Sequence, residues 1–148
     1  MRRPLLLALL LMATPALAAD PVKITADLFV VDDATQLATF TGNVVVVRND
    51  MTVWAPKVVV DYGEGGPSDI KSFVASGGVR IKTTTQDATG ERAIYDPHAE
   101  TLKLTGNVMV VNATSTVASP DLFLDLAADT TTFTGGKGGR VTGIFTPQ

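Results

Sequence analysis

The feature that most constrains this chain is an imperfect internal repeat. The segment Thr41–Val44 (TGNV) recurs as Thr105–Val108, 64 residues later. A third copy, Gly77–Ile81 (GGVRI), aligns with residues 42–46 at a shift of 35, and partial copies at both ends bring the period to 29–35 residues. Repeats of this length predict stacked supersecondary units, none of which can bury its apolar face alone.

Each repeat unit is rich in the residue types that favour β-strands. Val, Thr, Ile and Phe occur in runs such as residues 43–48 and 107–112, and Gly, Asn, Asp and Pro interrupt these runs. Arg80 and Lys82 alternate with Val79 and Ile81, which is the period of a half-buried strand. The sequence predicts an all-β fold of about 14–16 short antiparallel strands, since a typical strand has ~5–6 residues.

Repeated Asp and Gly residues mark the ends of these strands. An Asp at a strand end can accept hydrogen bonds from nearby backbone amides. A Gly between two strands permits a positive φ or a bulge that turns the chain from one sheet to the other. We interpret both sets as turn-forming residues: Asp32, Asp61, Asp96 and Asp125, and Gly42, Gly77, Gly106 and Gly135.

The N-terminal residues have the pattern of a secretory signal peptide. Arg2 and Arg3 precede a short apolar run, Leu5–Ala13, and Ala16-Leu17-Ala18 provides the small-x-small cleavage pattern. The apolar run is shorter than the ~20 residues that span a bilayer. We therefore predict a signal peptide over residues 1–18, with cleavage after residue 18 or 19, and a single domain over residues 19–148.

Charge and motifs argue against nucleic-acid binding and catalysis. The net charge is −3, and removal of the two signal-peptide arginines makes it −5. Without a basic cluster, nucleic-acid binding is not expected. The lone histidine, His98, lies in a turn sequence, and no motif of a nucleophile, phosphate loop or zinc site is present. Asp32-Asp33 and Asp61-x-x-Glu64 lack the EF-hand pattern of calcium sites. The sequence predicts no enzyme, cofactor or metal.

Four segments together resemble the OstA-like family of periplasmic lipopolysaccharide-transport proteins. They are Phe40–Val44, Ala88–Asp96, Leu102–Val108 and Gly139–Phe145. The resemblance implies an open, V-shaped β-jellyroll with an apolar interior, in a periplasmic protein that shields the lipid A acyl chains. It also implies head-to-tail assembly into a bridge between an LptC-like inner-membrane partner and an LptD-like outer-membrane protein. The Gly-rich stretch 135–139 departs from this pattern and loosens the expected last strand.

The interior can be inferred from the alternation of side chains. Val79 and Ile81 must point inward because their neighbours are charged, and this parity extends through the repeats. Such residues form either a filled core or a slot for acyl chains, and the sequence leaves both interpretations open. The predicted interior, lipid-binding set is Phe29, Val31, Phe40, Val44, Val46, Val53, Val58, Val60, Phe73, Ala75, Val79, Ile81, Ala93, Tyr95, Leu102, Leu104, Val108, Val110, Val117, Leu122, Leu124 and Phe133.

The first and last strands, around residues 22–27 and 140–145, are the expected sheet edges, where another chain can add on. The predicted edge contacts are Val22, Ile24, Ala26, Arg140, Val141, Ile144 and Phe145. Trp54 has the opposite parity to Val53, which places it on the outer surface as a candidate partner contact. Two other hypotheses remain open: a structural or adhesive β-repeat protein that binds no lipid and, more weakly, a glycan-active enzyme.

Overall fold

The computed structural model describes residues 21–66 and 69–147, and the predicted signal peptide lies outside them. The described residues contain ten strands and no α-helix, so none of their segments is a helix that could span a membrane. The strands are β1 (Lys23–Thr25), β2 (Leu28–Asp32), β3 (Leu37–Arg48), β4 (Met51–Asp61), β5 (Ser72–Lys82), β6 (Asp87–Asp96), β7 (Thr101–Val111), β8 (Ser115–Asp125), β9 (Thr130–Thr134) and β10 (Thr142–Phe145).

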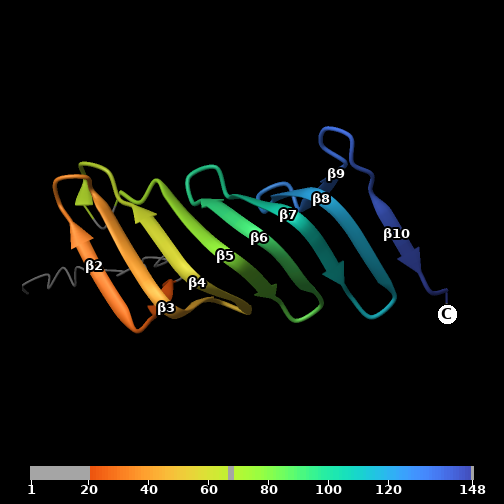
Figure 1. Cartoon of the computed structure of the whole chain (residues 1–148), viewed down its shortest axis with the longest axis horizontal. Helices are drawn as coiled ribbons and strands as arrows, with labels where there is room; N and C mark the ends of the chain where they lie inside the picture. Colours follow the sequence, from red (N-terminus) through yellow and green to blue (C-terminus); the bar gives the residue numbers. More distant parts are fainter. Residues whose placement is uncertain (1–20, 67–68, 148) are drawn as a thin grey trace, which may run out of the picture.

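The ten strands form one antiparallel sheet in which consecutive strands pair from β2 to β9, whereas β1 pairs with β3 and β10 pairs with β8. The six long strands β3 to β8 follow one another in order, and Figure 1 shows them side by side in a row with β2 and β10 near its two ends. This simple order follows from the repeat, since each hairpin adds the next unit beside the previous one. The all-β, open fold class is confirmed.

A two-residue bulge interrupts each of the strands β3, β5 and β7. The register of pairing shifts between Thr41 and Val44, and the equivalent shifts occur in β5 and β7. Both residues of each bulge have a positive φ, from +47° to +101°: Gly42 and Asn43, Gly77 and Gly78, Gly106 and Asn107. A Gly is needed at the first position, where φ is +84° to +90°. The repeated TGNV motif is therefore a bulge signal.

Acidic side chains pack against two of these bulges in the same way. The Nδ2 atom of Asn43 donates to Asp27, and that of Asn107 donates to Glu91, each over 3.2 Å. A Cβ on Gly42 or Gly106 would lie within 2.5 Å of those carboxylates. The side chain of Asp27 or Glu91 thus packs against the bulge, and a Cβ at the Gly position would clash with it.

Each bulge divides a long strand into two halves, which explains why the structure has ten strands instead of 14–16. The hydrogen-bonded ladder resumes beyond the bulge, so two expected short strands become one long strand. At both ends of the sheet the halves are separate strands. β1 and β2 pair with opposite halves of β3, and β10 and β9 pair with opposite halves of β8. If each of the six long strands is counted as two halves, these halves and the four short strands number sixteen.

The bends bring the two halves of the sheet face to face around an apolar core. The largest fully buried side chains, Leu104, Val44, Val58 and Val108, lie within a few residues of the bulges. Side chains nearer the hairpins, such as Val46 and Phe73, are only half-buried. The interior is therefore filled along the bend and looser toward the open side of the V.

The strand-end aspartates have the predicted turn role. The Oδ1 atom of Asp32 accepts from the backbone N of Ala34 at 3.0 Å, and that of Asp96 accepts from the N of His98 at 2.9 Å. Asp61 and Asp125 make equivalent bonds two and three residues onward. These carboxylates fix the hairpins at the rim.

A candidate lipid slot between the two halves of the sheet

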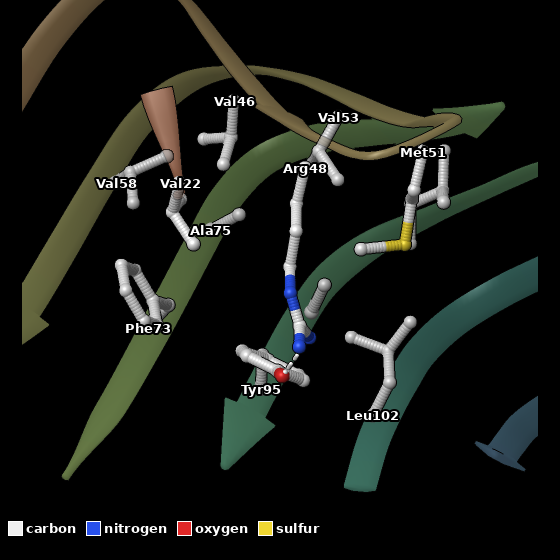
Figure 2. Close-up of a pocket in the computed structure, with 12 residues that line it drawn as sticks. Val22, Val46, Arg48, Met51, Val53, Val58, Phe73, Ala75, Tyr95 and Leu102 are labelled. Atoms are coloured by element: carbon white, nitrogen blue, oxygen red, sulfur yellow. Dashed lines mark hydrogen bonds between the residues drawn. The ribbon is translucent and has the colours of Figure 1, made fainter. Parts of the chain in front are cut away.

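An apolar cavity lies between the two halves of the sheet near its middle. Val46 and Val53 line it from one half, and Phe73, Tyr95 and Leu102 line it from the other, as Figure 2 shows. Its empty volume, including the open mouth, is about 520 Å³, and nearly all of the lining surface is apolar. Small side chains make this room: Ala75 and Ala93 oppose each other on β5 and β6.

A second hollow continues from this cavity to the N-terminal edge of the sheet. Val22 and Phe73 line both spaces, so the two adjoin. The hollow has an empty volume of about 850 Å³ when the open solvent at its mouth is included, and Phe29 and Val31 of the edge strand β2 form part of its wall. The Phe29 ring stacks on that of Phe40 at a centroid distance of 4.4 Å. The apolar interior is thus accessible from the first strands of the sheet.

A third hollow lies at the C-terminal end. Val110, Val117 and Phe133 line it from the interior face, together with Val141 and Phe145 of the last segment. Its empty volume, including the open solvent at its mouth, is about 850 Å³. Apolar interior surface therefore reaches both ends of the sheet.

The structure divides the predicted interior residues into three groups. Two of them, Phe29 and Val31, face the interior but are 54% and 50% exposed, because β2 is an edge strand. The half-buried group is Phe40, Val46, Val53, Phe73, Tyr95, Val117, Leu124 and Phe133. The buried group is Val44, Val58, Val60, Ala75, Val79, Ile81, Ala93, Leu102, Leu104, Val108, Val110 and Leu122.

Burial decides which of these residues can contact a ligand without rearrangement. Leu104, Val44 and Val108 are 0–1% exposed beside the bulges, which is the packing of a filled core. Val46, Val53 and Tyr95 are half-buried and line the cavity, so they remain the stronger lipid-contact candidates. The filled-core interpretation therefore applies near the bend of the sheet, and the slot interpretation applies nearer the open side of the V. The lipid-binding role of every residue in the set stays a prediction.

The predicted interior set did not include two residues that line the middle cavity, Arg48 and Met51. Arg48 continues the alternation Val44, Val46, Arg48 to the last residue of β3, so one further step along the strand would have found it. The assumption that charged side chains point outward hid it. Its Nη1 atom donates a hydrogen bond to the Tyr95 hydroxyl, which Figure 2 shows as a dashed line across the cavity.

The outer face carries a separate polar cluster. The Arg80 guanidinium lies 5.2 Å from the Trp54 ring centroid and bonds both carboxylate oxygens of Asp87 at 2.6 and 3.0 Å. The hydrogen bond from Arg80 holds the pKa of Asp87 below its ordinary value. The structure thus places Trp54 on the outer surface, as its parity predicted, and its role as a partner contact stays a prediction.

A tyrosine and an aspartate meet at the N-terminal rim of the slot. The Tyr62 hydroxyl donates to Asp33 at 2.8 Å, and both residues line the N-terminal hollow. The hydrogen bond to Asp33 raises the pKa of Tyr62 above its ordinary value of 10.0. Because the pair is exposed, we interpret it as a polar rim to the apolar hollow.

The acidic and histidine residues weighed in the sequence are spread over the hairpins. His98 is exposed in the turn between β6 and β7, with its Nε2 atom 3.8 Å from Asp69. Over residues 21–66 and 69–147, no group of three or more His, Cys, Asp or Glu side chains could hold a metal ion. The aspartates of the calcium hypothesis, Asp32 and Asp61, instead accept backbone hydrogen bonds in their turns.

The predicted edge residues lie in or beside the terminal strands. β1 begins at residue 23 and β10 ends at residue 145, and each pairs on one side only. Ile144 and Phe145 are 64% and 70% exposed, Arg140 and Val141 are also exposed, and Val22, Ile24 and Ala26 flank the N-terminal hollow or the core. The strand β2 was expected, but its position at an edge was not, and its residues Leu28–Val31 are all at least 50% exposed.

Comparison with known proteins agrees with this architecture. The chain is 33% identical over 99 residues to an uncharacterized protein of Rhizobium meliloti (strain 1021). The aligned region covers 63% of this chain and 53% of the relative. The chain thus spans about half the length of that curated relative.

Among solved structures, the fold matches LptH from Pseudomonas aeruginosa with a TM-score of 0.73 and 16% identity, covering 86% of this chain and 96% of the other. LptH is described as the LptA-homologous periplasmic component of the lipopolysaccharide transport device. The family model for the LptA/(LptD N-terminal domain) LPS transport protein matches residues 23–130. This match extends over well more than half of the sequence, so the chain belongs to the LptA/LptD N-terminal domain family of lipopolysaccharide transport proteins.

Proposed function

We propose that this protein carries lipopolysaccharide through the periplasm, with the lipid A acyl chains shielded in the slot. The observation that carries the proposal is the apolar interior, which is open in the middle of the sheet and hollow at both ends. A filled β-sandwich core would need no such space at its ends. The predicted signal peptide supports export to the periplasm.

The energetics favour acyl chains over sugars as the buried part. Each methylene removed from water contributes roughly 0.8 kcal/mol, so six buried methylenes contribute about 5 kcal/mol. The net charge of −3 gives no general attraction for an anionic ligand. We therefore expect binding to persist at high salt, with the phosphorylated sugars held outside the slot.

A slot-filling variant tests the proposal. Ala93 is 4% exposed and lines the middle cavity, so Ala93→Leu places three extra carbons where a chain would lie. Ala118 pairs with the exposed Met109 on the outer face, which makes Ala118→Leu the matched control. We expect Ala93→Leu to weaken binding of rough lipopolysaccharide about tenfold or more, which corresponds to ~1.4 kcal/mol, while Ala118→Leu does not.

The two outcomes separate the functional hypotheses. Overpacking costs about 1–3 kcal/mol, so circular dichroism must first show that Ala93→Leu is folded. A folded Ala93→Leu variant that binds as the wild type does would contradict the slot. If even the wild type binds no lipopolysaccharide, the structural β-repeat hypothesis is favoured.

The edge strands support a second part of the proposal, assembly into a head-to-tail bridge. Each edge leaves backbone donors and acceptors unpaired within the described chain, and exposed apolar residues flank both edges, Leu28–Val31 at one end and Ile144–Phe145 at the other. Pairing of the C-terminal edge with the N-terminal edge of the next copy would bring the terminal hollows together. Because such a contact is heterologous, it can continue into a filament. We propose that the ends of this bridge contact LptC-like and LptD-like proteins.

Light scattering tests the assembly. We expect the mass of the wild-type protein to rise with concentration, because each added copy offers a new edge. Phe145→Asp, at the last residue of β10, which pairs with Ser115 of β8, would place a charge in the contact and keep the protein monomeric. Thr89→Asp, at an exposed position of the central strand β6, which pairs on both sides, is the control. A wild-type protein that stays monomeric at high concentration would refute self-assembly.

A further inference from the structure

Among the described residues that line the middle cavity, Arg48 has the only charged side chain. It is half-buried at the end of β3, and its side chain crosses the cavity to the opposite half of the sheet (Figure 2). There its Nη1 atom donates to the Tyr95 hydroxyl, and its Cζ atom lies 5.8 Å from the Tyr95 ring centroid. A cation held in apolar surroundings loses solvation, so it needs a favourable partner.

The partner that Arg48 has in this structure is neutral. Among the described residues, no carboxylate lies within 4.0 Å of its guanidinium, and the ion pairs there belong to Arg80 and His98. A guanidinium carries five N–H donors in a planar fork, and a single hydroxyl oxygen accepts only part of them. Arg80 on the outer face shows the contrast, since both oxygens of Asp87 satisfy its fork. The guanidinium of Arg48 therefore has further N–H donors with which it can bind an anion.

We propose that Arg48 binds a phosphate group of the carried amphiphile at the mouth of the slot, in place of the Tyr95 hydroxyl. This inference rests on the proposed function, because it assigns a residue to the polar head of the ligand whose chains fill the cavity. The fork geometry of arginine matches two phosphate oxygens, and charge-assisted bonds of this kind are stronger than the neutral bond they replace. Both residues lie at strand ends, next to the hairpins that form the rim.

The position of Arg48 gives the ligand an orientation. Val46 precedes it by two residues on the same face, so chains bound beside Val46 lie deeper than the phosphate. Release of Tyr95 by Arg48 also removes the hydrogen bond that spans the cavity. The same exchange therefore binds the head group and opens the slot to the chains.

The test compares lipid A carrying both phosphates with the same acylated disaccharide after removal of the phosphates. Arg48→Met keeps an unbranched side chain of similar length and removes the charge. Loss of a charge-assisted hydrogen bond predicts roughly tenfold weaker binding of the phosphorylated lipid, with less than about twofold change for the dephosphorylated lipid. Arg80→Met on the outer face should change neither affinity. Tyr95→Phe should bind the phosphorylated lipid at least as well as the wild type, because Arg48 is then free.

The outcomes are separable. If the wild type binds both lipids and Arg48→Met weakens both equally or neither, the phosphate assignment is wrong and the slot remains. If the wild type binds neither lipid, the proposed function fails and the assignment fails with it. Should Arg48→Met not fold, Arg48→Lys retains the charge without the fork, and a selective loss of phosphorylated lipid A by that variant would still support the proposal, whereas unchanged binding would contradict it.

Discussion

The bulge in β5 allows the free-energy cost of its positive-φ backbone conformation to be measured. Gly78 has a φ of +101°, and a Cβ added there would meet nothing within 4 Å. Any destabilisation of Gly78→Ala therefore comes from the backbone conformation and not from a steric contact. Such a conformation costs a residue with a Cβ about 1–3 kcal/mol. The lower entropy of the unfolded alanine chain offsets about 0.4–1 kcal/mol of this cost.

We thus expect Gly78→Ala to lower the free energy of unfolding by about 1–2 kcal/mol, a fall in Tm of roughly 3–8 °C for a domain of this size. Gly77→Ala should cost more, because its Cβ would also meet the Pro56 Cγ atom at 3.1 Å. Guanidinium denaturation followed by fluorescence of Trp54, the only tryptophan, measures both. Ser76→Ala, one residue before the bulge, is the control and should change stability by less than about 0.5 kcal/mol. A Gly78→Ala variant as stable as that control would refute the requirement for a positive φ.

Three further predictions concern the core, the turns and the outer face. Leu104 is 0% exposed, so Leu104→Ala should cost about 3 kcal/mol in the same denaturation assay, and a cost below ~1 kcal/mol would mean that the bend is not tightly packed. Asp96→Ala removes two backbone bonds at the hairpin and should cost about 1 kcal/mol, with faster amide exchange at residues 98 and 99. Arg80→Gln should raise the pKa of Asp87 toward 3.8, measured from its carboxyl carbon by NMR. Because the pKa of Asp87 is lowered in the folded protein, the ion pair stabilises the fold at pH values above the unfolded pKa, and this stabilisation is lost as the pH falls through the folded pKa. An unchanged pKa of Asp87 in the variant would contradict the assignment.

The sequence predicted the class of fold and the direction of its side chains because the repeat supplies three independent copies of one pattern. Alternation around Val79 and Ile81 places Val44, Val58 and Leu104 on the inward face, and these side chains are buried. The strand number was overestimated for a physical reason. Locally, Gly42-Asn43 looks like the end of a strand, and only the ladder with β4, which resumes beyond it, shows that the strand continues.

Part of the candidate site depends on contacts distant in the chain. The local alternation is enough to place Arg48 inward, but its hydrogen bond to Tyr95, 47 residues away, has no signal in the local sequence. The exposure of Phe29 likewise depends on β2 having no further strand beyond it. How much of the interior is core and how much is slot was also beyond the alternation pattern, since an inward Val44 and an inward Val46 differ only in their distance from the bend.

Photo-crosslinking with lipopolysaccharide tests the central claim most directly. A photoreactive residue at Val46 would lie in the middle cavity, and one at Arg80 would lie on the outer face of the same sheet. The account predicts lipopolysaccharide adducts at Val46 and none at Arg80, in purified protein and in cells. Adducts at Arg80 alone, or at neither position in folded protein, would contradict an interior path for the lipid.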